Sequence, residues 1–279
     1  VVFGNLMEII SAPNNIKLAF RNIKGNDGSH TAGTDGRTIE SLAVMPEDKF
    51  VKLIQKQFRR YEPKAVRRVE IPKPNGKLRP LGIPCIIDRI VQQCILQVME
   101  PICEAKFYEH SYGFRPCRSA ENAISYAYGL AQMNKLHYVV DVDIKGFFDN
   151  INHDVLIGIL KERIADDRFI RLMWKFLKAG YIEDWTFHRT YSGTPQGGII
   201  SPILANIYLD KLDKYMKEYA CQFDRGDRRA MNLEYKRYSR KIWWLGTKLK
   251  QTKDKDTRKE LIDAIKQHQK NRMHLPSVD

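Results

Sequence analysis

The stretch VVDVDIKGFFDNINHD, residues 139–154, decides how the fold of this chain is interpreted. Its first half alternates valine with aspartate, as a half-buried strand does, and side chains two positions apart on a strand share one face. Asp141 and Asp143 would then project together, although an uncompensated buried charge is strongly destabilising. Two carboxylates on one face suit a hard cation such as Mg²⁺, which favours carboxylate oxygens and keeps waters for a phosphate-bearing substrate. The alternative is structural, with one aspartate paired to a buried arginine.

The second half of this stretch predicts a turn and then the start of a helix. Asp149 and Asn152 stand at the junction, where short polar side chains accept hydrogen bonds from the first helical amides. Asp154 falls in the first helical turn, where the helix dipole favours a negative charge. We therefore expect capping roles for Asp149 and Asn152, and a stabilising interaction with the helix dipole for Asp154.

Length and composition narrow the class of protein. The 279 residues are enough for one large domain or for two lobes that share an interface. The chain carries 47 Lys+Arg against 33 Asp+Glu, a net charge of +14, which is typical of proteins that meet phosphate backbones or anionic membranes. Its apolar runs are far shorter than the roughly 18 residues of a membrane span. The five cysteines show neither a C-x-x-C pair nor zinc spacing, and the sequence shows no secretion signal, so we expect a protein that is not secreted and works in a reducing compartment.

Three stretches differ in pattern along the chain. Helical patterns before residue 66 flank the glycine-rich loop GNDGSHTAGTDG, residues 25–36, which we expect to be flexible and exposed. Residues 66–84 alternate as an antiparallel hairpin whose Asn75-Gly76 pair suits a tight turn. Helical spacing then predicts one helix that ends near Pro101 and two more over residues 152–164 and 169–182. This order favours an α+β fold with a small antiparallel sheet surrounded by helices.

The last stretch, residues 221–279, holds sixteen Lys+Arg and eight acidic residues and has the pattern of one or two long helices. Mixed charge of this kind usually marks a solvated helical surface. Four aromatic residues stand among the bases, so an RNA-facing surface is the competing interpretation; they are Tyr235, Tyr238, Trp243 and Trp244.

The expected hairpin is strongly basic. Arg67, Arg68, Lys73, Lys77 and Arg79 crowd one short ribbon, and strand alternation places several of them on the same face. Guanidinium groups bind phosphates in bidentate fashion and lysine binds them as a point charge. The ribbon therefore suits a triphosphate.

A second loop, in SGTPQGGIISPILANIYLDKLD (residues 192–213), has unusual glycine density around Gln196. Glycines permit close backbone approach, and Ser201-Pro202 after them is a strong helix start. A glutamine flanked by glycines can present its amide to a ligand. A plain loop entering a helix is the alternative, but it explains Ser201-Pro202 and not the glycines.

Taken together, residues 67–124, 139–154 and 192–213 closely resemble the fingers and palm of reverse transcriptases encoded by group II introns, the maturases. The loop at residues 25–36 is similar to the one that extends the fingers of this family. The resemblance covers roughly residues 10–215 and implies a right-hand polymerase fold. It also implies the following division: N-terminal fingers extension 1–65, fingers and fingers–palm junction 66–138, partial palm 139–220, and basic helical insertion 221–279.

The resemblance implies roles for the palm residues. Asp143 corresponds to the first catalytic, metal-binding aspartate, and the carbonyl of Ile144 to a further metal ligand, with Asp141 as their neighbour. Phe148 is similar to the steric gate that favours deoxynucleotides. Gln196 resembles the palm residue near the incoming nucleotide.

The resemblance also implies roles for the basic residues. The nucleotide phosphates would be held by Arg67, Lys73 and Arg79. The phosphates of the nucleic acid would be within reach of Arg68, Lys77, Arg115 and Arg118.

The implied reaction is in-line attack of a primer 3′-hydroxyl on a deoxynucleotide, with two Mg²⁺ ions about 3.5–4 Å apart. The family's second group of carboxylates, a Tyr-x-Asp-Asp hairpin, follows the glutamine loop and is not in this sequence. The pair Asp166-Asp167 precedes that loop, between helical patterns, and is expected to be an inter-helix turn. We therefore expect an RNA-directed DNA polymerase and splicing cofactor of a bacterial cytoplasm or an organelle, and we expect the 279 residues of this sequence not to polymerise alone.

The expected partners are an intron RNA template, a DNA primer and deoxynucleoside triphosphates, with a homodimer left open and no membrane. The alternative function is a non-catalytic RNA-binding splicing module on a polymerase scaffold. Retron, diversity-generating and CRISPR-associated reverse transcriptases are alternative relatives, but the N-terminal loop and the motif spelling favour the group II type.

Overall fold

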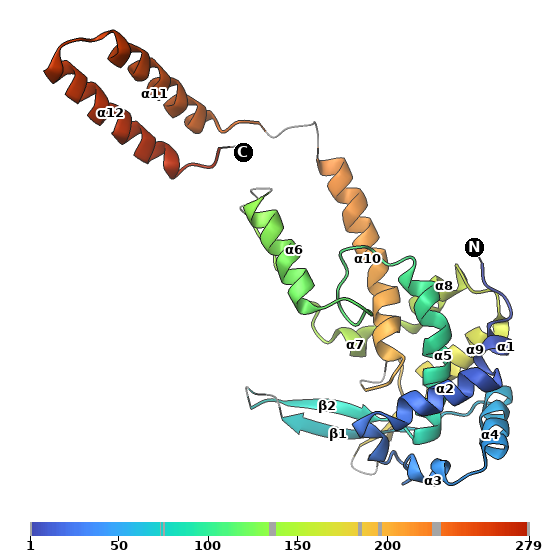
Figure 1. Cartoon of the computed structure of the whole chain (residues 1–279). Coiled ribbons are helices and arrows are strands. Elements are labelled where there is room, and N and C mark those ends of the chain that lie inside the picture. Colours follow the sequence, from blue (N-terminus) through green and yellow to red (C-terminus); the bar gives the residue numbers. More distant parts are fainter. Residues whose placement is uncertain are drawn as a thin grey trace. The chain divides into compact units, whose positions relative to one another are not determined.

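The computed structural model describes residues 2–72, 74, 76–133, 138–183, 186–194, 197–224 and 230–277, with Arg79 described for its backbone alone. Contacts divide the chain into two compact units, Val1–Met216 and Lys217–Asp279 (Figure 1). The first unit combines helices with a small sheet, so the predicted α+β class is confirmed. The predicted division into four parts, including its boundary at residue 220, stays a prediction.

The helices of the first unit follow local signals. Pro13 opens α2, and Ser119 and Asn122 form a capping box at the start of α6. The α5 helix runs three residues past Pro101, the predicted end, because a proline in the last turn removes only one amide donor. The helices that begin in the first unit are α1 (Leu6–Ile10), α2 (Pro13–Lys24), η1 (Asp27–His30), α3 (Glu40–Ala43), α4 (Glu47–Arg59), α5 (Ile86–Glu104), α6 (Ala120–Gln132), α7 (Phe147–Asn150), α8 (His153–Lys161), α9 (Asp167–Leu177) and α10 (Ser201–Phe223).

The sheet contains β1 (Val66–Pro72), β2 (Leu78–Ile83), β3 (Tyr181–Glu183) and β4 (Thr186–His188), in the order β2-β1-β3-β4. The predicted β1–β2 hairpin is confirmed, but β1 and β3 are parallel, so the sheet is mixed and not antiparallel. The predicted helix over residues 169–182 ends instead at Leu177. Gly180, with φ +73°, turns the chain there, and its carbonyl accepts a hydrogen bond from the Val66 amide at 3.1 Å.

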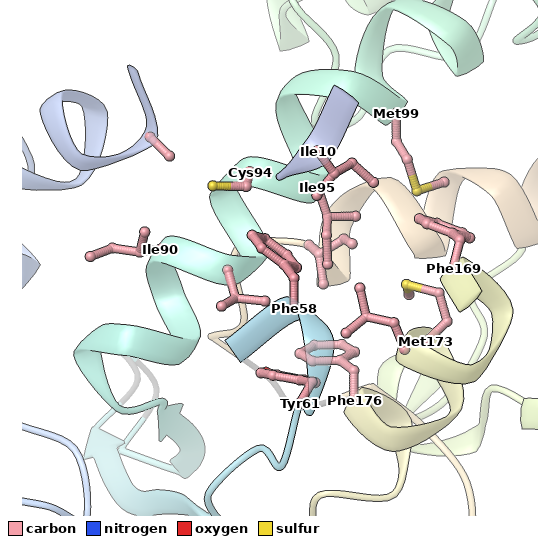
Figure 2. Packing of buried hydrophobic residues seen from close by; sticks show 14 of the residues in the cluster. Ile10, Phe58, Tyr61, Ile90, Cys94, Ile95, Met99, Phe169, Met173 and Phe176 are labelled. Carbon is pink, nitrogen blue, oxygen red and sulfur yellow. The ribbon is translucent and has the colours of Figure 1, made fainter. Parts of the chain in front are cut away.

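The core of the first unit is built around α5. Its residues Ile90, Cys94, Ile95 and Met99 are almost fully buried, and side chains of α4 and α9 gather on them (Figure 2). Each fully buried aliphatic side chain contributes about 1.5–3 kcal/mol relative to exposure. The helical core therefore holds the elements from which the hairpin and the functional loops extend.

The glycine-rich loop at residues 25–36 is held against the start of α5, and most of its residues are exposed, as predicted; its flexibility stays a prediction. The guanidinium of Arg89 donates hydrogen bonds to the carbonyls of Gly28 (2.6 Å), Thr31 (2.7 Å) and Pro84 (2.8 Å). A Cβ at Gly33 would lie 2.7 Å from the Cα of Cys85. Two loop carbonyls bonded to Arg89 and one close backbone approach hold the loop against α5.

The second unit holds α11 (Leu233–Gln251) and α12 (Lys255–Met273), which lie side by side as a hairpin in Figure 1. The prediction of one or two long helices is thus confirmed as two. Asn232 and Asp254 cap them by accepting hydrogen bonds from the Tyr235 and Thr257 amides. Of the helices that the structure describes, none is both long and apolar enough to cross a bilayer.

Candidate functional site

The carboxylate segment, residues 138–145, is irregular in the structure, whereas the sequence predicts a strand there. Val139, Val140 and Val142 are 78–88% exposed. A strand needs a neighbour because its backbone N–H and C=O groups must be paired. The sheet that the described residues form does not include this segment, so the prediction is wrong here and Asp141 and Asp143 lie exposed on irregular backbone.

Asp143 and Ile144, the predicted metal ligands, are both exposed. Within the described ranges, no three His, Cys, Asp or Glu side chains gather closely enough to hold a metal ion. A carboxylate and a backbone carbonyl are ligand types that Mg²⁺ accepts, but two of them fill only part of its octahedral shell. The described residues therefore fit one side of a metal site and not a complete one.

The turn that follows this segment positions Phe148. Gly146 adopts φ +61°, and its carbonyl accepts a hydrogen bond from the Asn150 side chain at 2.9 Å. The Phe148 ring then meets the Phe114 ring edge-on, with centroids 6.4 Å apart, and the Phe147 ring at 5.8 Å. Phe148 is therefore held by aromatic packing, half-buried, five residues after Asp143.

The glycine loop, residues 192–194 and 197–198 of the described chain, lies against this turn. The Gly193 amide donates to the carbonyl of Ile151 at 2.7 Å, and the Thr194 amide donates to that of Phe148 at 2.8 Å. Gly193 has φ +84°, and a Cβ there would lie 2.5 Å from the Phe148 carbonyl oxygen. Two motifs that are more than 40 positions apart in sequence are thus joined by backbone hydrogen bonds.

Two buried side chains that the sequence reasoning missed also fix the glycine loop. The Nε2 atom of His153 lies 2.6 Å from the Gly193 carbonyl, and the Gln92 side-chain oxygen accepts from the Ile199 amide at 2.8 Å. Gly197 touches β2, since a Cβ there would lie 2.2 Å from the Gly82 carbonyl oxygen. The only sequence signal was a polar residue among apolar helix positions, which does not reveal a distant partner.

The hairpin arginines lie on opposite faces of β1, because neighbouring residues on a strand alternate. Arg68 is 3.3 Å from a Glu183 carboxylate oxygen and 4.6 Å from the Tyr181 ring centre. The Nε of Arg67 is buried and has no hydrogen-bond partner among the residues described. Burial lowers the pKa of Arg89, and the positive charge of Arg67 lowers it further.

A cavity of about 450 Å³ lies between the hairpin, β3 and the glycine loop. This is within the size range of small-molecule sites. Two arginines and one aspartate are among the residues that line it, which include Arg68, Asp149, Tyr181, Arg189, Tyr191 and Thr194. Asp149 therefore lies within α7 and in the cavity wall. Of the two residues predicted to cap the next helix, Asn152 caps α8, because its side chain accepts a hydrogen bond from the Val155 amide.

Four further residues are predicted to contact the nucleotide or the nucleic acid: Lys73, Lys77, Arg79 and Gln196. Lys73 and Gln196 lie outside the described residues, and the Arg79 backbone pairs with Ile71 in the hairpin. Lys77 is exposed just before β2. Their roles stay predictions.

Arg115 is a structural residue, which corrects the expectation that its guanidinium is available to phosphates. It is buried and donates hydrogen bonds to both carboxylate oxygens of Glu104. It also donates to the carbonyls of Tyr108 and Ser111, both at 2.7 Å. Its donors are thus used within the fold. Arg118 donates to the Glu109 carbonyl at 2.6 Å and is partly exposed.

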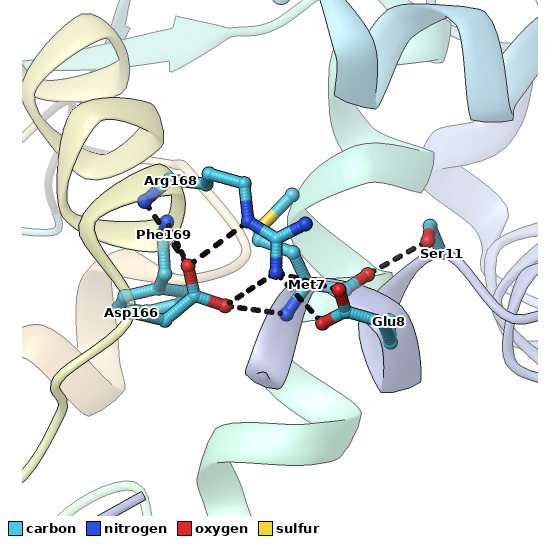
Figure 3. A network of polar contacts seen from close by, with 6 residues as sticks. All are labelled: Met7, Glu8, Ser11, Asp166, Arg168 and Phe169. Carbon is cyan, nitrogen blue, oxygen red and sulfur yellow. Dashed lines mark hydrogen bonds and ion pairs between the residues drawn. The ribbon is translucent and has the colours of Figure 1, made fainter. Parts of the chain in front are cut away.

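Asp166 is the N-cap of α9 and Asp167 is its first residue, as the predicted inter-helix turn requires. Figure 3 shows the contacts of Asp166. The Asp166 carboxylate accepts hydrogen bonds from the amides of Met7 (3.1 Å) and Arg168 (3.0 Å), and the Arg168 guanidinium also pairs with Glu8 at 2.6 Å. Burial raises the pKa of Asp166, but these hydrogen bonds outweigh burial and hold it below its ordinary value. This pair is a helix cap and an anchor for α1.

Comparison with known proteins agrees with the arrangement of these motifs. A family model described as "Reverse transcriptase (RNA-dependent DNA polymerase)" matches residues 71–238. The Group II intron-encoded protein LtrA of Lactococcus lactis subsp. cremoris is 38% identical over 279 residues, which cover 99% of this chain and 45% of that protein. Protein YkfC of Escherichia coli (strain K12) is 40% identical over 220 residues, 76% of this chain and 57% of that protein. The chain therefore spans about half the length of these curated relatives.

A solved structure shares the fold. A chain of the "Partial Cas6-RT-Cas1--Cas2 complex" matches 88% of this chain and 41% of its own length, with a TM-score of 0.51 and 21% identity. The family model covers more than half of the chain and includes the hairpin from Ile71 onward, the Phe148 turn and the glycine loop. The resemblance seen in the sequence is thus confirmed, and the chain belongs to the reverse transcriptase (RNA-dependent DNA polymerase) family.

Proposed function

We propose that the full-length protein is an RNA-directed DNA polymerase of the group II intron type, which also binds intron RNA as a splicing maturase. One observation carries the proposal: the glycine loop bonds to Phe148 and Ile151 and packs on Gly82 of β2. This contact brings the basic hairpin, the Phe148 turn and the loop that contains Gln196 to one place. A nucleotide-binding site needs these parts together, because binding must also orient the reacting groups.

In this proposal the incoming nucleotide lies between the hairpin and the glycine loop. The Arg67 guanidinium lies on the face of β1 opposite the cavity-lining Arg68. Its Nε lacks a partner within the described chain, and a buried donor without a partner favours a phosphate on that face. Lys73 and Arg79 add positive charge, and Gln196 contacts the base or sugar. The half-buried Phe148 ring occupies the space in which a ribose 2′-hydroxyl would lie.

Asp143 and the Ile144 carbonyl would bind Mg²⁺, which when present stabilises the attacking and leaving oxygens of phosphoryl transfer. Because these two ligands form only one side of a site, further carboxylates of the full-length protein complete it. We expect the 279-residue chain alone to give no primer extension.

The partners in this proposal are an RNA template, a DNA primer and deoxynucleoside triphosphates, in a bacterial cytoplasm or an organelle. The LtrA relative is named a group II intron-encoded protein and is similar across 99% of this chain, which supports an intron RNA. The non-catalytic splicing module is the second candidate. The exposed, irregular backbone of residues 138–145 favours this second candidate only if no further segment of the full-length protein pairs with these residues as a neighbouring strand.

The proposal is tested by sugar discrimination during RNA-templated primer extension with the full-length protein. Phe148→Ala should raise ribonucleotide incorporation at least tenfold relative to deoxynucleotide incorporation, because the ring no longer fills the 2′ position. Phe187→Ala, which truncates an exposed phenylalanine of β4, is the matched control and should leave the ratio unchanged. If the Phe148→Ala protein is active and its ratio of ribonucleotide to deoxynucleotide incorporation is unchanged, Phe148 has only a packing role and does not select the sugar.

A further inference from the structure

The α11–α12 hairpin packs along one stripe of each helix. The Tyr238 ring lies 5.7 Å from the His268 ring, and the Arg272 guanidinium lies 5.3 Å from the Tyr235 ring centre. On α11 the half-buried residues recur every three or four positions, as in a helix that packs along one face: Tyr235, Tyr238, Ile242, Leu245 and Leu249. The contact between the helices therefore uses one side of α11 and leaves the other side open.

Two adjacent tryptophans occupy the open side of α11. Trp243 is 73% exposed and Trp244 52% exposed, and neither belongs to the stripe that packs on α12. Arg240 lies one helical turn before them, since positions three and four apart are neighbours on a helix. The Lys248 ammonium lies 4.0 Å from the Trp244 ring centre, in cation–π contact. We call this surface the tryptophan face; its residues are Lys236, Arg240, Trp243, Trp244 and Lys248.

The charge of the tryptophan face is not neutralised by neighbours. The α11 helix carries six Lys and Arg residues and a single acid, Glu234, in its first turn. Across the portion of the chain that the structure describes, none of these six cations forms an ion pair. Exposed aromatic rings beside unpaired cations offer both a stacking surface and a site for phosphates.

We propose that the tryptophan face of α11 binds an unpaired segment of RNA, with bases stacked on Trp243 and Trp244 and phosphates held by Lys236, Arg240 and Lys248. The choice of RNA rests on the proposed function. Double-helical RNA has its bases already stacked and offers no free ring face to tryptophan. A helix that lies in a membrane surface needs a continuous apolar face. Viewed down the axis of α11, Arg240 lies between Trp243 and Trp244, so this face is not continuously apolar. Unpaired RNA accounts for both the rings and the charges.

The experiment measures binding of fluorescent single-stranded RNA to the whole 279-residue chain by anisotropy, at several salt concentrations. The Trp243→Ala/Trp244→Ala double variant should weaken binding about tenfold or more, because stacking is lost, and should keep the salt slope. Arg240→Ala/Lys248→Ala should weaken binding and make the slope shallower by roughly one, because fewer counterions are released. The matched control is Ile262→Ala/Met273→Ala, which truncates two exposed apolar residues of α12 and should change neither quantity.

Each contrary result has a definite meaning. Equal affinity of the tryptophan double variant and the wild type, with circular dichroism showing intact helices, overturns the proposal. Tighter binding to duplex RNA, to single-stranded DNA of the same sequence, or to phosphatidylglycerol vesicles than to single-stranded RNA also overturns it and identifies the other partner. None of these results bears on catalysis, since the assay involves no polymerisation and leaves Asp143 untouched.

Discussion

At the scale of single residues, Asp88 is the carboxylate that the fold perturbs most clearly. It lies in the first turn of α5, is 6% exposed, and accepts a hydrogen bond from the Lys64 amide at 3.2 Å. Burial raises its pKa from 3.8 to about 6, and the Lys64 amide opposes this only in part. The folded chain therefore binds the Asp88 proton more tightly than the unfolded chain does.

This shift predicts a pH dependence of stability. The stabilisation of the folded state by the protonated Asp88 carboxyl is fully present below pH 3.8 and is lost as pH rises through about 6. The loss amounts to roughly 3 kcal/mol, since each pKa unit corresponds to about 1.4 kcal/mol. Urea unfolding between pH 4 and 7 should show wild type losing stability relative to Asp88→Asn, which does not ionise. A difference between the two proteins that stays constant over this range would contradict the raised pKa.

The Asp166 cap gives a second prediction at this scale. Asp166→Ala removes an N-cap, worth about 1 kcal/mol, and leaves the buried Met7 amide unpaired, worth about 1–3 kcal/mol more. The free energy of unfolding should fall by about 2–4 kcal/mol in denaturant titrations. The adjacent exposed Asp167→Ala is the control and should cost under about 0.5 kcal/mol. Equal losses in the two variants would mean that Asp166 does not anchor α1.

At the scale of elements, Arg89 connects α5 to the glycine-rich loop. Arg89→Met should release the carbonyls of Gly28 and Thr31, so the loop should detach before the core unfolds. Amide exchange at Ser29, Thr31 and Ile39, whose N–H groups are bonded within this segment, should become much faster than in wild type. Exposed Arg21→Met on α2 serves as the control. Retained protection at the three amides would show that Arg89 is dispensable for the loop.

The sequence predicted the elements whose signals are local. The β1–β2 hairpin follows from alternation and a turn pair, and α8 follows from Asn152 at its cap and apolar spacing. Residues 139–144 have the alternation of a strand, yet strand formation depends on a neighbour that local sequence does not supply. The same reason explains β3, which pairs with the distant strand β1, whereas the local pattern predicts a helix that continues to residue 182.

Within the candidate site, the motifs were recognisable from sequence but their supports were not. Phe148 and the glycine loop stand out by composition, and the structure places them in contact. His153 and Gln92 hold that loop through bonds across 40 and 107 positions, which no local pattern encodes. Arg115 looked like a surface cation because its partner Glu104 lies eleven residues away, on another element.

At the scale of the whole molecule, the net charge of +14 predicts RNA binding that depends strongly on salt. Each neutralised phosphate of a single strand contributes about −0.7 to the slope of log K against log salt. Four or five contacts would therefore lower the affinity at least tenfold between about 50 and 200 mM salt. Anisotropy titrations with the 279-residue chain measure this directly. Affinity that changes less than twofold would rule out the basic surface as the RNA site.

The central claim is that Asp143 is a catalytic carboxylate of an RNA-directed DNA polymerase. The most direct measurement is RNA-templated primer extension by the full-length protein with Mg²⁺, comparing wild type with Asp143→Ala and with Asp141→Ala, the neighbouring exposed carboxylate. RNA affinity is measured for all three proteins alongside. We predict extension by wild type and Asp141→Ala, none by Asp143→Ala, and equal RNA affinity throughout. Extension by Asp143→Ala, or no extension by any of the three although all bind RNA, would contradict the claim.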